Sequence, residues 1–200
     1  MTRPRRFGDA GQAFPIYIMV MGGLLFLALV YFAVGQATVN RGGAQTAADA
    51  AALAAAQDTR DQLADEWVRE VLDPAKWEDI FTGNGQGLEP SCPRAGQLAE
   101  QNDAHLLRCD PEGLEFTVDV QTNKSMGKSV VPITENKRSK ASATAVIKPL
   151  CTFPPLTADA GPKVLPILTC RNSRQWDLDP KNLTELPKPQ DLFDVHLADR

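Results

Sequence analysis

Cysteines are the residues of this chain best suited to covalent chemistry, and they lie at Cys92, Cys109, Cys151 and Cys170. An even count in an exported region is typical of a disulfide framework. Four cysteines allow three pairings and the sequence alone does not decide, but we expect the first to pair with the second and the third with the fourth. Each of these pairs brackets a loop of similar length that contains Pro or Gly. Free thiols are the alternative, while the lack of a CxxC motif argues against zinc.

No combination of residues predicts catalysis. His105 and His196 are the only histidines, and neither has the spacing of a metal ligand or of a catalytic base. The chain has no serine elbow, P-loop, GxGxxG or HExxH motif. Glu66 and Glu70 have helical spacing but stand among Arg and Lys, which favours a solvated helix face over acid–base work. We expect no catalytic residue, no metal site and no cofactor.

The elements that must hold these side chains begin with an apolar segment. The chain has no Lys, Arg, Asp or Glu from Ala10 to Asn40, and the 23 residues from Ala13 to Gly35 are apolar almost throughout. As a helix they span roughly 35 Å, against about 30 Å for the hydrocarbon core of a bilayer. We predict a transmembrane helix over residues 13–37. The alternative is a cleaved signal peptide, because residues 35–37 offer small side chains at a signal-peptidase spacing.

Flanking charges predict the orientation. Three arginines lie in the short head, residues 1–12, and Arg41 is the only Lys or Arg in the fifteen residues after Gly35. This asymmetry favours a cytoplasmic N-terminus, a single pass through the plasma membrane and an extracytoplasmic remainder. From Arg41 onward there are 18 Lys and Arg against 24 Asp and Glu, a net charge of −6. We therefore expect membrane lipid as a partner and no nucleic acid.

An alanine-rich helix follows over residues 38–73. Alanines recur in it at every fourth position and form a smooth stripe on which another helix could pack closely. Intrinsic helix propensity is the alternative reason for them. Asp73-Pro74 ends the helix, because the residue before a proline is disfavoured in the helical conformation. The candidate packing residues are Ala44, Ala48, Ala52 and Ala56.

Residues 74–150 predict a small disulfide-containing domain, so the fold class is α+β. Alternating apolar residues predict strands at 114–122 and 141–148, and residues 129–133 a third. Alanines on one face of the second strand indicate that a helix packs there, so we expect a small antiparallel sheet against the long helix. Residues 151–200 are rich in proline, and we expect an extracytoplasmic extension with little regular structure.

The connection between the two strands is basic. Its cations could contact anionic lipid headgroups or an acidic partner, and the simpler interpretation is a solvated hairpin loop. They are Lys124, Lys128, Lys137, Arg138 and Lys140.

The N-terminal quarter resembles a known family. Gly11-Gln12-Ala13, the apolar span and the sequence AQTAADAAALAAA at residues 44–56 are similar to the N-terminal region of TadE/TadG-like proteins of the bacterial Flp (tight adherence) pilus-assembly system. The resemblance covers about Gly11 to Gln57. It implies a cell-surface structural or accessory component of a pilus or secretion apparatus, whose N-terminal helix contacts other pilus-assembly or membrane proteins.

One departure from pilins concerns processing. A prepilin peptidase cuts after a Gly, and pilins have a Glu five residues after the cut. A cut after Gly11 puts Ile16 at that position, and a cut after Gly8 puts Ala13 there. We therefore expect an uncut, anchored accessory subunit. The alternative function is an anchored extracellular binding module with no pilus role. Genes for a secretion ATPase beside this one would favour the pilus role.

Overall fold

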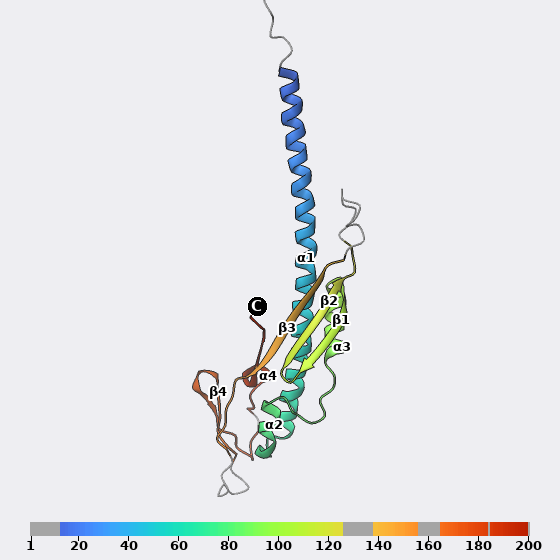
Figure 1. Cartoon of the computed structure of the whole chain (residues 1–200). Coiled ribbons are helices and arrows are strands. Elements are labelled where there is room, and N and C mark those ends of the chain that lie inside the picture. The colour runs from blue at the N-terminus through green and yellow to red at the C-terminus, as the bar shows by residue number, and fades with distance from the viewer. Residues whose placement is uncertain (1–12, 126–137, 156–164, 184, 200) are drawn as a thin grey trace, which may run out of the picture.

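One long helix dominates the molecule (Figure 1). The computed structural model describes residues 13–125, 138–155, 165–183 and 185–199. Helix α1, Ala13–Arg69, contains 57 residues and is therefore about 85 Å long. Its first part stands clear of the rest of the chain, and its second part carries the folded domain (Figure 1). The helix runs unbroken through Gly42-Gly43 and ends shortly before Asp73-Pro74, in agreement with the sequence.

The remaining elements are short. In chain order they are η1 Pro74–Lys76, α2 Trp77–Phe81, α3 Cys92–Gln101, β1 Ala104–Glu112, β2 Glu115–Thr122, β3 Lys140–Pro149, β4 Leu168–Cys170, η3 Arg171–Ser173, β5 Arg174–Trp176, α4 Pro189–Leu192 and β6 Phe193–Leu197.

Four strands form one antiparallel sheet in the order β1-β2-β3-β6. Strands β2 and β3 are the two expected from alternation, so the predicted α+β class with a small antiparallel sheet is confirmed. The third expected strand, 129–133, lies outside the described residues. Strands β1 and β6, at the two edges of the sheet, were not predicted.

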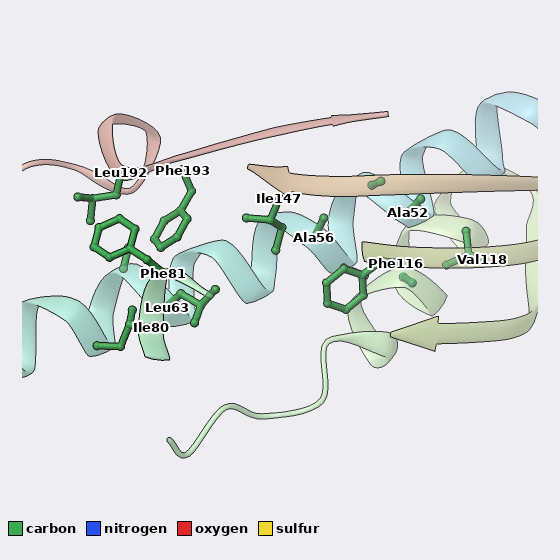
Figure 2. Packing of buried hydrophobic residues seen from close by; sticks show 14 of the residues in the cluster. Ala52, Ala56, Leu63, Ile80, Phe81, Phe116, Val118, Ile147, Leu192 and Phe193 are labelled. Carbon is green, nitrogen blue, oxygen red and sulfur yellow. The ribbon is translucent and has the colours of Figure 1, made fainter. Parts of the chain in front are cut away.

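Helix α1 covers one face of this sheet (Figures 1 and 2). Every second residue of the two central strands points toward it, and Val118 and Ala145 are fully buried. The helix presents alanines to these strands, which lets the two backbones approach closely. The expectation that a helix packs on the alanine-bearing strand is confirmed. The buried strand residues are Phe116, Val118, Val120, Ala143, Ala145 and Ile147.

The core contains larger side chains toward the C-terminal end of α1. Trp67 of the helix lies 5.5 Å from Trp77 of α2, measured between ring centroids. Phe81 stacks on Phe193 at 5.2 Å, and Phe153 contacts the edge of Trp77 at 5.4 Å. Leu63, Ile80 and Leu192 complete this end of the core (Figure 2). Short helix α2 thus closes the bottom of the domain against α1.

The expectation of an irregular C-terminal extension is wrong for the described residues. Strand β6 pairs with β3 in antiparallel register from Ala145↔Leu197 to Pro149↔Phe193, and it completes the sheet. The prolines are compatible with this order because they lie at element boundaries: Pro149 ends β3 and Pro189 begins α4. Proline is tolerated at the first turn of a helix because its missing N–H has no intrahelical partner there.

Candidate membrane anchor and assembly surface

The N-terminal part of α1 is an apolar surface that the chain itself does not cover. Phe14–Phe32 contains 19 residues with a mean hydropathy of 2.2, and none of them is buried. Its large side chains are 44–83 % exposed. Nineteen helical residues span about 28 Å, close to the thickness of a bilayer core. This segment is long and apolar enough to cross a membrane, and so large an exposed apolar surface requires lipid or protein to cover it.

The environment of α1 changes between Phe32 and Ala44. Val34 and Val39 are still exposed, and the hydroxyl of Thr38 donates a hydrogen bond to the carbonyl oxygen of Val34 at 3.0 Å. Arg41 is the first charged residue after the span and is exposed. From Ala44 onward the sheet and α3 cover the helix. The junction thus separates an uncovered apolar segment from a covered one.

The alanine stripe does not form a free surface. Ala44, Ala48, Ala52 and Ala56 are all 0 % exposed, and the last three belong to the core formed with the sheet and α3 (Figure 2). Packing on another helix and simple helix propensity are the two interpretations that the sequence left open for this stripe, and in the structure other elements of the same chain cover it. The physical reason is that the small side chains allow the sheet of the same chain to approach α1 closely.

A groove of about 610 Å³ lies where α1 leaves the domain. Its helix side includes Phe32, Val39 and Gly43, whose spacing of seven and four residues places them on one face of α1. Its domain side is formed by the residues at the end of α3 and the ends of β1 and β2. The described residues that line it are Tyr31, Phe32, Gly35, Val39, Asn40, Gly43, Asn102, Asp103, Thr122, Lys124 and Ser125.

Hydrogen bonds fix the domain side of the groove. The backbone N–H of Asn123 donates to the carbonyl oxygen of Asp103 at 2.7 Å, and that of Thr122 donates to Ser139 at 2.9 Å. The Thr122 hydroxyl donates to the carbonyl oxygen of Lys124 at 3.0 Å. The Lys124 ammonium lies 3.3 Å from the Asp103 carboxylate, and both side chains are largely exposed. The backbone that carries Lys124 is therefore held in place, while its ammonium faces solvent.

Part of the basic connection is described. Lys124, Arg138 and Lys140 are exposed at the end of the β2–β3 pair from which α1 continues toward its apolar segment (Figure 1). Lys128 and Lys137 lie outside the described residues. The structure thus places cations beside the junction between the covered and uncovered parts of α1.

Both disulfides have the sequential pairing. Cys92–Cys109 joins the first residue of α3 to β1, with 5.8 Å between the Cα atoms. Cys151–Cys170 joins the segment after β3 to β4. Each closes a loop of 17 or 19 residues, which in the chain-entropy model stabilises the fold by about 3 kcal/mol. The first bond links α3 to an edge strand of the four-stranded sheet, and the second links the segment after β3 to the two-stranded β4–β5 sheet.

Glu66 is buried rather than solvated, which corrects the expectation from its charged neighbours. It is 5 % exposed, and its Oε1 accepts a hydrogen bond from the backbone N–H of Gln86 at 2.6 Å. A Cβ at Gly85 would meet this carboxylate, so a larger residue there would require the Glu66 side chain to shift. One turn earlier, Gln62 Oε1 accepts the N–H of Glu89 at 2.7 Å. These two side chains hold the glycine-rich loop on α1, and only the glycines of that loop signalled it in the sequence.

The two histidines lie far from each other, on opposite edges of the sheet. His105 Nδ1 is 3.0 Å from Oδ1 of Asn123 beside β1, and His196 Nδ1 is 3.4 Å from the Asp194 carboxylate on β6. Within the described ranges, no group of three or more His, Cys, Asp or Glu side chains could hold a metal ion.

These features define a protein in which one helix serves as an apolar, membrane-length segment and as the support of a small disulfide-containing α+β domain. Residues 11–58 match the model of the Tad family, described as Flp pilus-assembly TadE/G-like. The match extends from the start of α1 through the alanine-rich segment, and it confirms the predicted resemblance of the N-terminal region. No curated protein and no solved structure matches the chain significantly. The matched family is a pilus-assembly component and not a known enzyme family, which supports a role related to Flp pili.

Proposed function

We propose that this protein is a single-pass, membrane-anchored structural subunit of a Flp (Tad) pilus-assembly or related secretion apparatus. The observation that carries the proposal is the unbroken helix α1. Its exposed apolar part, Phe14–Phe32, continues directly into the alanine segment on which the domain is built. A rigid rod of this kind transmits position from the membrane to the domain, which is a structural role and needs no catalytic site.

The charges and cysteines support the proposed topology. Three arginines precede the span and one arginine follows soon after it. Under the positive-inside rule, this difference places the N-terminus in the cytoplasm. Both disulfides lie on the other side of the span, and disulfides persist in oxidising compartments. The domain is accordingly extracytoplasmic. Alkylation in intact cells tests this: four reactive thiols without prior reduction would contradict it.

Contacts with partner proteins are expected along the uncovered part of α1. The alanines from Ala44 to Ala56 are covered by the sheet and α3, so we expect helix–helix contacts at the segment Phe14–Phe32 or the junction that follows. The exposed face of the sheet remains for contacts outside the membrane. The partners are other pilus-assembly or membrane proteins.

In vivo photo-crosslinking tests the assembly role. A photoreactive residue at Leu29, which is exposed in the span, should capture a membrane protein encoded with the pilus system, whereas the same residue at buried Ala52 should not. Deletion of the gene should remove Flp pili, and the intact gene should restore them. Unchanged piliation, with no pilus protein captured at Leu29, would contradict the proposal and favour an anchored extracellular binding module.

The N-terminus is proposed to remain uncut. The Glu that pilins place five residues after the cleavage site is replaced by Ile16 for a cut after Gly11, and Gly11 lies outside the described residues. Intact-mass measurement of the membrane-bound protein should give the full chain. A form that begins at Gln12 or Thr38 would refute this part of the proposal.

A further inference from the structure

The groove at the junction of α1 and the domain has the chemistry of a lipid site. We propose that it holds one anionic phospholipid of the leaflet on the domain side, with acyl chains along α1 and the headgroup phosphate at Lys124. This inference rests on the proposed membrane anchoring of α1, and it adds a specific ligand and a specific location to it.

The position of the groove along α1 agrees with this occupant. If Phe14–Phe32 fills the hydrocarbon core, Phe32 lies at its boundary, and Val39 lies about 10 Å farther along the helix. The headgroup layer adds roughly 5–8 Å on each side of the core. The part of the groove beside Phe32 therefore lies at the headgroup layer, and the part beside Val39 lies just beyond it on the domain side. A phospholipid beside α1 would have its glycerol and phosphate at this level.

The helix side of the groove, its floor, is apolar, and the domain side, its rim, is polar. A phospholipid requires both. Phe32 and Val39 are 64 % and 77 % exposed apolar side chains, and Gly35 and Gly43 leave open space between them, since a Cβ at either would meet nothing within 4 Å. Polar groups from the domain form the opposite rim. A volume of about 610 Å³ lies within the range of small-molecule sites, roughly 300–1,000 Å³.

Positive charge at the rim selects an anionic headgroup. Among the described residues, the Lys124 ammonium pairs with the largely exposed Asp103 carboxylate at 3.3 Å, and exposed pairs of this kind are weak. Phosphate can therefore replace that carboxylate. Arg138 and Lys140 are exposed at the adjacent end of the same strand pair, and Arg41 lies on α1 near Val39. A long lysine side chain can also extend toward the membrane while its charge remains in the polar layer.

A lipid fits the domain side of the groove better than a partner helix does. A helix packed alongside α1 lies 8–10 Å from its axis and, if continued past the membrane, would meet Asn102 and Asp103, which line the domain side. A phospholipid ends at the membrane surface and would not extend past these domain residues. The combination of apolar side chains on α1 and cations on the domain side favours the lipid.

Adjacent glycines offer a matched test. Gly43 lines the groove and Gly42 does not, and a Cβ at either position meets nothing within 4 Å. Both Gly43→Leu and Gly42→Leu improve helix propensity equally, but only the first fills the groove. The full chain, purified in detergent, is mixed with phosphatidylglycerol or phosphatidylcholine, and bound lipid is counted by native mass spectrometry.

The wild type and Gly42→Leu should retain phosphatidylglycerol in preference to phosphatidylcholine, and Gly43→Leu should lose that bound lipid. Lys124→Gln should lower the preference about fivefold, as expected for one lysine near an anionic surface. Lys148→Gln, near the other end of β3, should not change it. Carbonate extraction of membranes should leave all four variants membrane-bound.

Several outcomes would overturn the lipid site. Equal retention of the two lipids by the wild type would show that the headgroup charge is not recognised. Equal behaviour of the Gly43→Leu and Gly42→Leu variants would show that the groove is not the location. If Gly43→Leu kept its lipid but lost cross-links to a partner helix, the groove would be a helix-docking surface. Release of the wild type by carbonate would instead contradict the anchoring itself.

Discussion

Two segments of the same helix have opposite environments. Phe14–Phe32 is apolar and entirely uncovered, whereas the segment from Ala44 to Trp67 has its apolar side chains buried against the sheet, α2 and α3. Helix α1 continues through both without a break. The comparison shows that the presence of apolar residues in a helix does not by itself indicate whether the rest of the chain covers that helix.

Side-chain size distinguishes the two segments. The exposed one is built from Phe, Leu, Ile, Met, Val and Tyr, which present a large apolar area to their surroundings. The covered one begins with alanines, whose small side chains allow close approach of a sheet, and ends with Trp67 in an aromatic cluster. Bulky side chains suit a fluid acyl environment, which adapts to any shape. Alanines suit a fixed partner surface, because close packing needs a smooth contact.

Trp67→Ala should produce the largest difference between the two segments. Trp67 is fully buried against Trp77, and removal of a buried aromatic side chain costs about 3–5 kcal/mol. Leu27→Ala truncates a 63 % exposed side chain of the other segment and should leave domain stability unchanged. Urea unfolding of the full chain in detergent, followed by the fluorescence of the remaining tryptophans, measures both. Equal losses would show that the segments are not energetically distinct.

Leu25→Arg should disturb the other segment selectively. A charged residue at the centre of a membrane helix costs about 2.5–3.5 kcal/mol on insertion scales. We expect a smaller fraction of the protein to remain in membranes after carbonate extraction. Thr46→Arg, at an exposed position of the covered segment, is the control and should stay membrane-bound. An unchanged fraction for Leu25→Arg would exclude this segment as the anchor.

Ala52→Leu tests whether the alanine segment belongs to the core. Insertion of a larger side chain into a packed core costs about 1–3 kcal/mol, so the urea midpoint of the domain should fall. Thr46→Leu adds a similar side chain at an exposed site and should have little effect. If Ala52→Leu left the domain stable but abolished cross-linking to another protein, the stripe would be an assembly face after all.

Much of this fold is visible in the sequence because its signals are local. The apolar span is recognisable by length and lack of charge, and β2 and β3 by strict alternation. Ala143 and Ala145 indicated a helix on that face, and α1 lies there. The sequential cysteine pairing is favoured by loops of similar length that contain Pro or Gly, and the structure has it.

The edge strands were missed for different reasons. In β1 the register shifts between Leu106 and Arg108, so the bulge breaks the alternation on which strand prediction depends. In β6 the alternation is present, since Phe193, Val195 and Leu197 share one face, but the surrounding prolines indicated irregular structure. The signal for strand β6 in the sequence was therefore a five-residue run of alternating apolar residues close to many prolines.

The role of Glu66 and the fate of the alanine stripe depend on contacts between distant parts of the chain. Glu66 is buried because a loop twenty residues later lies over it and donates the Gln86 N–H. The stripe is covered because the sheet folds back onto the helix that precedes it. Helical periodicity reports which residues share a face, but it does not report which element will cover that face.

The smallest expected effect comes from the open face of the sheet, where charges contribute little. On β2, a hydrogen bond from Ser142 and the adjacent Arg108 guanidinium lower the pKa of Asp119 below its usual value near 3.8. A carboxylate whose pKa is lower in the folded state than in the unfolded state stabilises the fold at pH values above its unfolded pKa. This contribution is lost as the pH falls from about 3.8 through the folded-state pKa. The Arg108 Nε lies 3.0 Å from the Asp119 carboxylate, whose side chain is 33 % exposed. The contribution should therefore be below about 1 kcal/mol because solvent screens the pair.

Asp119→Asn should accordingly lower the free energy of unfolding slightly at pH 7, and the difference from the wild type should shrink as the pH drops below about 4. Asp110→Asn removes another carboxylate near Arg108, 3.5 Å from its guanidinium and more exposed, and serves as the control for loss of a charge. Urea unfolding of the three proteins at a series of pH values measures the difference directly. A loss as large as that expected for Trp67→Ala would mean that the open face of the sheet, and not the contact with α1, holds the domain together.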